Sequence, residues 1–445
     1  MAEISPFHAL HYNPEKVPAL SAVATQPYDK ISAEMQERYY RSSPYNLVRV
    51  IRGHALPEDG PGNNVYTRAA SDFQDWINRG VLVSEGEPAI YPYHQEYEVP
   101  GQSGVRKERR GFIALMRLED YSAHVVHRHE ETLSGPKADR LELLKTTRAH
   151  FGQIFMLYSD PVGEVEKELA GSTGEKPWEQ VIDEYGTQHT VWRVADSAAL
   201  GRLATDMREK KVVIADGHHR YETALAYRQY CRQAGRTDGR AEYVMATFIR
   251  METPGLTILP SHRLVHSLGH LDWSQFAAKA CTIFDWEEAA EGGLVCEWVG
   301  PFLGRLNAAG AQRPAVGVYG GPGKLAVLRL RVDFDLGTAL ADIAPTLRHL
   351  DVVLLHRLVL ERLLGIDRQA VREEKNLSYL REASLACESV QSGRGQVAFL
   401  LNPTPVAAVH DNALADCPMP QKSTDFYPKL LSGLTMYWLE NPAGI

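Results

Sequence analysis

Cysteine is scarce in this chain, and long apolar runs are missing. The 445 residues include five cysteines, which lie far apart without any paired spacing. This pattern excludes a disulfide framework and a zinc finger, and it is typical of free thiols in a reducing compartment. No stretch approaches the length of about 18 apolar residues that a membrane helix needs. We therefore expect a cytoplasmic protein that does not span a membrane.

An excess of basic residues is also absent. The formal net charge is −8, and a mildly acidic chain is a poor general ligand for nucleic acid, so we expect no nucleic-acid partner. The start, MAEISPFHALHYNP, has no basic segment followed by an apolar run and predicts no secretory signal. The common templates HExxH, GxSxG, GxGxxG, CxxC and the P-loop are all missing.

The length exceeds what one hydrophobic core usually serves, so we expect more than one domain. Predicted helices interleave with strands, and several strands look paired in hairpins. This favours an α/β protein of mixed α+β character, with mixed sheets and flanking helices. We place a catalytic region at 1–266, with a β insertion near 85–120. A C-terminal α+β domain at 267–445 would contribute the motif at 419–434.

Local patterns predict individual elements. Alternating apolar and charged residues in NLVRVIR (46–52) predict a strand, whereas residues 65–79 predict an amphipathic helix. Residues 212–215 form a short apolar run that predicts a strand, followed by a helix at 219–235. The segment at 419–434 predicts a polar loop that leads into a helix.

The strongest chemical signal lies where this strand meets this helix. Gly217 allows a tight turn, and free N–H groups at a helix start favour an anion. His218, His219 and Arg220 add donors, and an arginine can bind phosphate through two parallel hydrogen bonds. Asp216 could cap the helix, orient a histidine or act as a base. The alternative is an ordinary capped helix with solvated histidines.

A second polar segment, HRHEET at 127–132, precedes a predicted charged helix. Lys137, Arg140 and Arg148 would form a second basic wall facing the same ligand. A solvated loop and an exposed helix remain the alternative.

The same segment also allows a metal site. If residues 127–131 are extended, then His127, His129 and Glu131 share one face. Together with His218 and His219, they would supply the ligands of a metal-dependent hydrolase.

Three further turns carry candidate residues. Lys422, Ser423 and Thr424, with Lys429 nearby, are natural phosphate ligands close to a predicted helix start. In QPYDKI (26–31), an acid precedes a helix, where capping competes with a role as base. The turn PSHR (260–263) follows a strand and could contribute to the site.

Several motifs together resemble the bacterial family known as domain of unknown function 1015. ADGHHRYETAL (215–225) resembles its signature. Other segments agree along nearly the whole chain: ISPFHALHYNP (4–14), QPYDKIS (26–32), HEETLSGPKADRLELLKTTRA (129–149), LPSHRLV (259–265) and MPQKSTDFYPKLLSGL (419–434).

The Asp-Gly-His-His-Arg turn also resembles the phosphate-binding turn of the ParB/sulfiredoxin superfamily, which includes an ADP-dependent free-serine kinase. The resemblance implies a ParB/sulfiredoxin-like core in which this turn holds nucleotide phosphates. It also implies that Asp216 and an N-terminal acid activate a hydroxyl acceptor, with Asp29 the candidate and Glu34 the runner-up. Sulfiredoxins place a cysteine within the turn, where His218 stands here, so sulfinic-acid repair is not expected.

We therefore predict a phosphotransferase that moves phosphate between a nucleotide such as ADP or ATP and a small hydroxylated metabolite, with serine or O-phosphoserine as the leading candidate. Mg²⁺ would accompany the nucleotide. A metal-dependent hydrolase and a non-catalytic nucleotide binder remain alternatives, and a homodimer is left open. The predicted site comprises catalytic residues Asp216, His218 and Asp29, phosphate ligands Gly217, His218, His219, Arg220, His129, Lys137, Arg140, Arg148, Lys422, Ser423 and Thr424, and substrate contacts Tyr28, His262 and Arg263.

Overall fold

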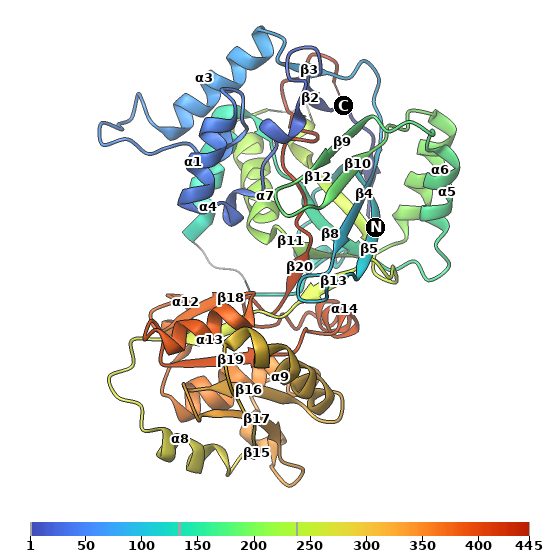
Figure 1. The fold of residues 1–445 in the computed structure, drawn as a ribbon. Coiled ribbons are helices and arrows are strands. Elements are labelled where there is room, and N and C mark those ends of the chain that lie inside the picture. Colours follow the sequence, from blue (N-terminus) through green and yellow to red (C-terminus); the bar gives the residue numbers. More distant parts are fainter. Residues whose placement is uncertain (1, 132–134, 237–238, 445) are drawn as a thin grey trace. The chain divides into compact units, whose positions relative to one another are not determined.

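The computed structural model describes residues 2–131, 135–236 and 239–444, which form two compact units (Figure 1). Unit 1 comprises Met1–Arg128, Thr132–Thr257 and Pro428–Ile445, and unit 2 comprises His129–Glu131 and Ile258–Tyr427. The division after Thr257 precedes the boundary expected at 266, and the last residues of the chain return to unit 1. Both units contain a sheet with flanking helices, as predicted.

A mixed nine-stranded sheet forms the centre of unit 1, in the order β6-β11-β8-β12-β5-β4-β10-β9, with β1 paired to β5. Strands β11 and β6 are parallel, as are β12 and β8, whereas β11 and β8 are antiparallel. The strands are β1 (Ile4–Ser5), β4 (Tyr91–Glu98), β5 (Arg106–Arg117), β6 (Val126–Arg128), β8 (Ile154–Tyr158), β9 (Glu179–Ile182), β10 (Gln188–Val191), β11 (Val212–Asp216) and β12 (Tyr243–Arg250).

One face of this sheet carries the main core of unit 1. Alternate residues of the central strands, such as Phe112, Met156 and Phe248, pack with residues of α5 (Glu164–Ser172), α6 (Ser197–Arg208) and α7 (His218–Gln233). Because successive side chains of a strand point to opposite faces, the intervening residues form a second layer on the other face. That second face carries unusual polar side chains, which are described with the site below.

A separate helical layer packs around a second core of unit 1. It consists of α1 (Ala33–Ser42), α2 (Val48–Ile51), α3 (Val65–Asn78) and α4 (Gly135–Thr147), joined by the short pairs β2 (Leu10–Tyr12) with β3 (Leu82–Ser84) and β7 (Ala149–His150) with β21 (Tyr437–Trp438). The predicted helix at 65–79 is confirmed as α3. Its N-cap Asn64 and Thr67 form a reciprocal capping box.

The strand predicted at 46–52 is wrong, because this segment forms the short helix α2. The Asn46 side chain accepts a hydrogen bond from Val48 N at 2.9 Å and donates to Ala22 O at 2.8 Å, which turns the chain into a helix. Val48, Val50 and Ile51 are all buried in the helical layer. The apolar residues that suggested a strand are therefore apolar because this short helix is buried on several sides.

Unit 2 contains an antiparallel six-stranded sheet, in the order β15-β17-β16-β19-β14-β18. Helices α9 and α13 cover one face, with Trp298, Phe302 and Ala386 in the core. The elements are β14 (His262–Val265), α8 (Trp273–Ala280), β15 (Phe284–Glu288), α9 (Val295–Gly310), β16 (Ala315–Tyr319), β17 (Leu325–Leu330), α10 (Leu336–Ala339), α11 (Asp351–Leu354), a π-helix (Leu355–Leu363), α12 (Arg368–Arg372), β18 (Leu377–Leu380), α13 (Ala383–Gln391), β19 (Val397–Leu401) and α14 (Val406–Leu414).

The helix predicted at the end of the segment 419–434 is also wrong. Residues Asp425–Tyr427 form strand β20, which pairs with β13 (Thr257–Leu259). Residues 428–436 form an irregular segment with a turn at Gly433 and no helix. Ser432 forms an isolated antiparallel β-bridge with Thr25, and Met436 forms one with Leu10. The chain thus runs through the interior of unit 1, where long-range partners satisfy its backbone.

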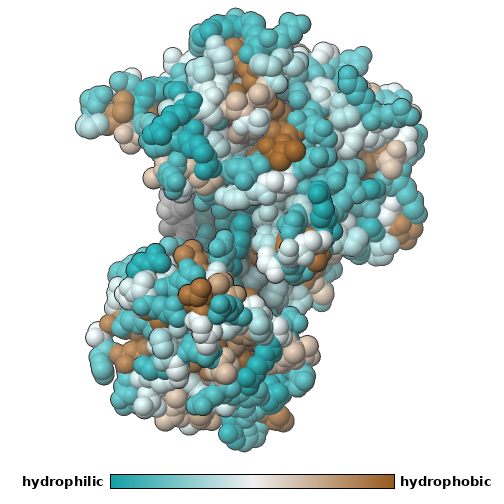
Figure 2. Space-filling view, in the orientation of Figure 1, coloured by the Kyte–Doolittle hydropathy of each residue, from teal (hydrophilic) through white to brown (hydrophobic). Residues whose placement is uncertain are grey.

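The surface is mainly polar on the face shown in Figure 2, where hydrophobic residues gather only in small, scattered patches. Among the described residues, no helix is both long and apolar enough to cross a bilayer.

Candidate functional site

The junction of β11 and α7 confirms the predicted strand–turn–helix. Gly217 is the N-cap of α7 with a φ of 92°, a left-handed conformation that favours glycine. A Cβ atom at this position would lie only 3.0 Å from the Arg220 guanidinium. No side chain in the described part of the chain caps α7, and the first turn contains no acidic residue. The helix start therefore presents backbone N–H groups and positive potential beside an arginine.

Asp216 is the centre of a cluster of charges at this junction. Its Oδ2 atom accepts a hydrogen bond from Arg220 Nη2 at 2.5 Å, and its Oδ1 atom accepts one from Lys429 Nζ at 3.1 Å. The pairing of β11 with β8 shifts register between Ile214 and Asp216, so a β-bulge sets the direction of this side chain. Burial favours the neutral acid, but Lys429, Arg220 and Lys30 outweigh it and hold the pKa of Asp216 well below its usual range.

Arg220 is fixed by a second contact. Its Nη1 atom donates to the backbone carbonyl of Gln153, which precedes β8. Gln153 is itself buried, and its side-chain oxygen accepts from Thr247 at 2.6 Å. The guanidinium is therefore held between Asp216 and the start of β8.

Lys429 is positioned by buried side chains of β4 and β5. Arg109 donates to Pro428 O at 2.5 Å and to Gln95 Oε1 at 3.0 Å. Gln95 Nε2 in turn donates to Lys429 O at 2.9 Å. Burial lowers the pKa of Arg109 to about 10, while Asp216 is one of the groups that raise it. A fully buried arginine is costly, and the contacts with Pro428 and Gln95 offset this cost.

A buried chain of polar side chains continues behind this segment. Asp183 Oδ2 lies 3.2 Å from His189 Nε2, and His189 Nδ1 lies 2.6 Å from the Tyr93 hydroxyl. The Tyr93 oxygen accepts a hydrogen bond from Leu431 N at 3.4 Å. Burial lowers the pKa of His189 although Asp183 opposes this, so the imidazole is neutral at pH 7. The network fixes the backbone at Leu431, which lies between Lys429 and Ser432.

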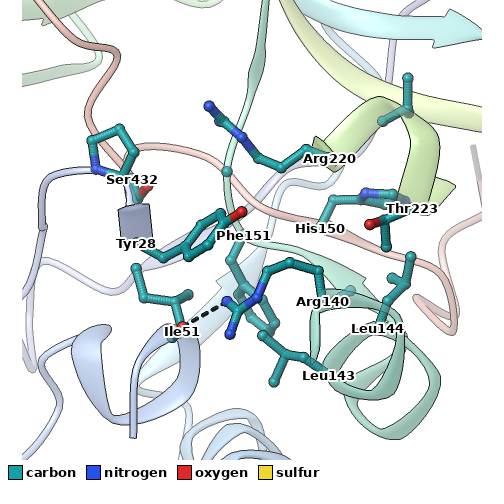
Figure 3. Close-up of a pocket in the computed structure, with 14 residues that line it drawn as sticks. Tyr28, Ile51, Arg140, Leu143, Leu144, His150, Phe151, Arg220, Thr223 and Ser432 are labelled. Atoms are coloured by element: carbon teal, nitrogen blue, oxygen red, sulfur yellow. Dashed lines mark hydrogen bonds between the residues drawn. The ribbon is translucent and has the colours of Figure 1, made fainter. Parts of the chain in front are cut away.

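A pocket of about 70 Å³ lies beside Arg220, which is several times the volume that one water molecule requires. Figure 3 shows the Tyr28 ring between the side chains of Arg220 and Arg140. The Arg140 guanidinium lies 4.2 Å from the centre of the Tyr28 ring and donates to Ile51 O at 2.7 Å. Leu143, Leu144 and Phe151 form the apolar part of the wall. Tyr28 and Arg140, predicted from distant segments, are thus brought together with Arg220.

The pocket also contains residues that the sequence did not reveal. His150, Gly152, Thr223 and Ser432 line it. Burial lowers the pKa of His150 to about 4, so its imidazole is uncharged at neutral pH and can accept a hydrogen bond. Its ring stacks on that of Tyr437, with centroids 5.8 Å apart. A single histidine beside a short strand gives no pattern by which it could be predicted.

Other predicted residues of unit 1 have partners elsewhere. Lys137 pairs with Glu222, and Arg148 pairs with Glu440 just after α4 ends. Arg148 therefore does not share a helix face with Arg140.

The two candidate N-terminal acids are exposed. Asp29 lies in the 3₁₀ turn Tyr28–Lys30 and Glu34 in the first turn of α1, and neither lines the pocket. Ser32 is the N-cap of α1, with its side chain accepting from Met35 N at 3.1 Å. Capping of α1 is thus performed by Ser32, which leaves both carboxylates available at the surface.

Unit 2 contains the predicted phosphate ligands at 422–424. Glu130 accepts hydrogen bonds from Lys422 N at 3.0 Å, from Thr424 N at 2.8 Å and from the Thr424 hydroxyl at 2.8 Å. His129 Nε2 lies 2.7 Å from the same hydroxyl, and Ser423 donates to a backbone carbonyl. A carboxylate of the chain thus occupies the donors that were expected to bind phosphate.

The residues predicted at 262–263 are buried in the sheet of unit 2. His262 Nδ1 accepts from Leu401 N at 3.1 Å, and burial lowers the pKa of His262 to about 3. Arg263 donates to Lys422 O at 2.9 Å and stacks on Tyr379. Both side chains are almost inaccessible, so the predicted substrate contacts find no support in this unit.

The alternative metal site finds no support either. Among the described residues, no group of three histidine, cysteine, aspartate or glutamate side chains could hold a metal ion. His127 is buried in unit 1, with Nε2 lying 3.1 Å from His124 O, whereas His129 and Glu131 belong to unit 2. Residues 132–134 of this motif lie outside the described residues.

Comparison with protein families agrees with the sequence motifs between residues 4 and 265, whereas the motif at 419–434 lies outside the match. The family model described as protein of unknown function (DUF1015) matches residues 4–353. No curated protein matches the chain. Among solved structures, a conserved hypothetical protein from Pyrococcus furiosus has 9% identity and a TM-score of 0.37, over 74% of this chain and 96% of that chain. A free serine kinase in complex with AMP has 10% identity and a TM-score of 0.36, over 72% of this chain and 92% of that chain. Because the family model covers most of its length, the chain belongs to this family of proteins of unknown function.

Proposed function

We propose that unit 1 is a phosphotransferase that moves phosphate between a nucleotide and a small hydroxylated metabolite, with serine or O-phosphoserine as the leading candidate. One observation carries the proposal. An ionised carboxylate, Asp216, lies between Arg220 and Lys429 at the uncapped start of α7, beside a pocket. Phosphoryl transfer depends mainly on positioning and on positive groups around the transferred phosphate, and this cluster supplies both.

The nucleotide phosphates would bind at the start of α7. Backbone N–H groups at a helix start and the helix dipole favour an anion there, and Gly217 allows its close approach. In the structure, Asp216 pairs with both Arg220 and Lys429 and keeps both cations oriented. A bound phosphate would take over part of this pairing. His218 and His219, half-buried on the first turn of α7, are further candidate ligands.

The acceptor would occupy the pocket beside Arg220. Its wall combines the hydroxyls of Tyr28, Thr223 and Ser432 with the neutral imidazole of His150. These groups can hydrogen-bond a small polar molecule, and the pocket volume of about 70 Å³ suits a compact one. The sequence resemblance to free-serine kinase favours serine among such acceptors.

The residues fit a magnesium ion that is bound mainly through the nucleotide. Mg²⁺ in such sites uses one or two carboxylates together with substrate phosphates, and Asp216 is a carboxylate next to the expected phosphate position. When bound, the ion would neutralise charge on the phosphates.

A nucleotide binder without turnover is the second candidate. It is favoured by the pKa of Asp216, which lies well below its usual range because Lys429 and Arg220 outweigh the effect of burial. A carboxylate with so low a pKa is a weak general base, since an efficient base has a pKa near the working pH. In a phosphotransferase, Asp216 would therefore orient cations and metal, and exposed Asp29 would be the candidate that accepts the hydroxyl proton.

Phosphorus NMR of the purified protein with Mg²⁺ tests the proposal. One set of samples would hold serine with ATP, ADP or pyrophosphate, and the other O-phosphoserine with AMP or ADP. We expect phosphate to move between nucleotide and serine. Transfer should be lost in Arg220→Ala, with nucleotide affinity weakened by about 1.5–3 kcal/mol, the usual contribution of a hydrogen bond to a charged group.

Arg202→Ala is a matched control. Arg202 makes a similar pair with Glu168, with contacts of 2.9 and 2.8 Å, on the exposed surface of unit 1. This variant should transfer phosphate normally. Nucleotide binding without transfer in the wild-type protein would support the second candidate. Equal nucleotide affinity in Arg220→Ala and the wild type, with both folded, would contradict both candidates.

A further inference from the structure

Unit 2 contains a cavity of about 120 Å³, several times the volume that one water molecule requires. Its wall has an apolar part, formed by Ile343, Leu347, Val353, Ile366 and Val371. Such a surface favours a compact aliphatic group, because burying it releases ordered water.

Three arginines form the polar part of the same wall. Arg357, Arg368 and Arg372 line the cavity together with the carboxylates of Glu131 and Glu361. The wall carries three positive and two negative side chains, and Asp342, which accepts hydrogen bonds from both Arg357 and Arg368, brings a third carboxylate, so these six charges balance. His356 adds no charge, because burial and Arg263 hold its pKa well below the usual value. A ligand of low net charge suits this wall.

Arg357 has unused hydrogen-bonding capacity inside the unit. It donates to Asp342 Oδ2 at 2.8 Å through Nη2. Its Nε and Nη1 atoms are buried and have no hydrogen-bond partner within the described residues, although Nη1 lies 3.2 Å from Glu361 Oε2. The Glu361 oxygen likewise lacks a hydrogen-bond donor in the described chain. Buried N–H groups of an arginine are costly when unsatisfied, so this pair is suited to a ligand that supplies the missing contacts.

The backbone that carries these groups is itself unusual. His356, Arg357 and Glu361 all belong to the π-helix Leu355–Leu363. Such helices are rare and occur frequently at functional sites, because their weaker hydrogen bonding is retained only where it positions side chains. The cavity, the arginine and the irregular helix thus coincide.

We propose that this cavity binds a small molecule that carries one carboxylate next to a branched aliphatic group. The carboxylate pairs with Arg357 and with Arg372, whose planar guanidinium groups suit it. The aliphatic part lies against Leu347, Val353 and Val371. A phosphate dianion is disfavoured by Glu131 and Glu361. Two kinds of molecule share this chemistry. One is a free branched acid, and the other is an amino acid whose ammonium group would donate a hydrogen bond to Glu361.

Calorimetric titration of the full-length protein at pH 7 tests the proposal with three probes. Leucine carries both charges, 4-methylpentanoate carries the carboxylate alone, and 3-methylbutylamine carries the ammonium alone. We expect binding of leucine, of 4-methylpentanoate or of both, and none of the amine. Binding of leucine alone assigns the site to an amino acid, and binding of the acid assigns it to a carboxylate without need of the ammonium.

Two variants locate the site. Arg357→Gln and Arg372→Gln should each weaken binding about tenfold or more, the consequence of losing a charged hydrogen bond. Arg372 is 54% exposed, so its variant should fold even if Arg357→Gln does not. Arg331→Gln, which removes a surface pair with Asp333, is the matched control and should bind normally. No binding of leucine or the acid at millimolar concentration, equal binding of the amine, or unchanged affinity in Arg372→Gln would overturn the proposal.

Discussion

Replacing Asp216 with asparagine should tighten the binding of pyrophosphate in the absence of magnesium, although it should abolish phosphoryl transfer. The carboxylate pairs with Arg220 and Lys429, the two cations that the phosphate would need. Asparagine keeps the shape of the side chain but removes its charge. Both cations then become available to the ligand, and the repulsion between carboxylate and phosphate disappears.

The magnitude follows from the position of Asp216. A phosphate charge about 6 Å from the carboxylate is repelled by about 0.7 kcal/mol at the dielectric constant of water and by about 2.8 kcal/mol at an effective value of about 20. The Asp216 side chain is 20% exposed, which places it between these limits. We therefore expect pyrophosphate to bind about tenfold more tightly. With magnesium present, the advantage should vanish, because the variant lacks the carboxylate for the ion.

Calorimetric titration with pyrophosphate, with and without magnesium, measures this effect. Asp120→Asn is the control, since Asp120 also pairs with an arginine, Arg228, through two contacts of 3.0 Å, and the change of net charge is the same. Its affinity should equal that of the wild type. If Asp216→Asn weakens metal-free binding, or if Asp120→Asn tightens it equally, then Asp216 does not compete with the ligand for these cations.

Two further predictions concern stability. Lys429→Met should lower the free energy of unfolding by about 2–4 kcal/mol, the usual cost of breaking a buried pair, since Asp216 keeps only Arg220 as a partner. Urea unfolding measures this loss. The control is Lys145→Met, which removes the more exposed pair of Lys145 with Glu142 and should lower the free energy of unfolding by less than about 0.5 kcal/mol. His262→Asn, which keeps an acceptor for Leu401 N, should reduce acid sensitivity. The pKa of His262 is about 3 in the folded protein and about 6.5 in the unfolded chain. The free energy of unfolding of the wild type should therefore fall by about 2–3 kcal/mol between pH 7 and about pH 4.5, and that of the variant should not fall by this amount. An equal pH dependence in both proteins would refute this.

Local sequence patterns predicted the turn of the site well. The apolar run before Asp216 can only be buried as a strand, and Gly217 is required by a left-handed backbone. The polar residues that follow start a helix, whose first turn is exposed enough to hold them. Each of these features depends on neighbours within a few residues, so no knowledge of the rest of the fold was needed.

The segment at 428–436 could not be predicted in this way. Its composition suits a helix, yet its backbone pairs with Thr25, with Leu10 and with the buried side chains of Arg109 and Gln95. These partners lie hundreds of positions away in the sequence, and their hydrogen bonds outweigh local preference. The same reason explains why polar residues such as His262 looked functional: a buried histidine with a backbone partner has the same sequence signature as an exposed one.

The charged residues of the site come from two segments that lie far apart in the sequence. Asp216 ends β11 and Arg220 lies four residues later in the first turn of α7, but Lys429 follows more than two hundred residues later, beyond the stretch matched by the family model. Arg109 and Gln95 hold the backbone of that segment, so these two buried side chains fix the position of Lys429, which is itself buried. Because Lys429 supplies one of the two cations paired with Asp216, the charge cluster is complete only when the segment around Lys429 has packed into unit 1.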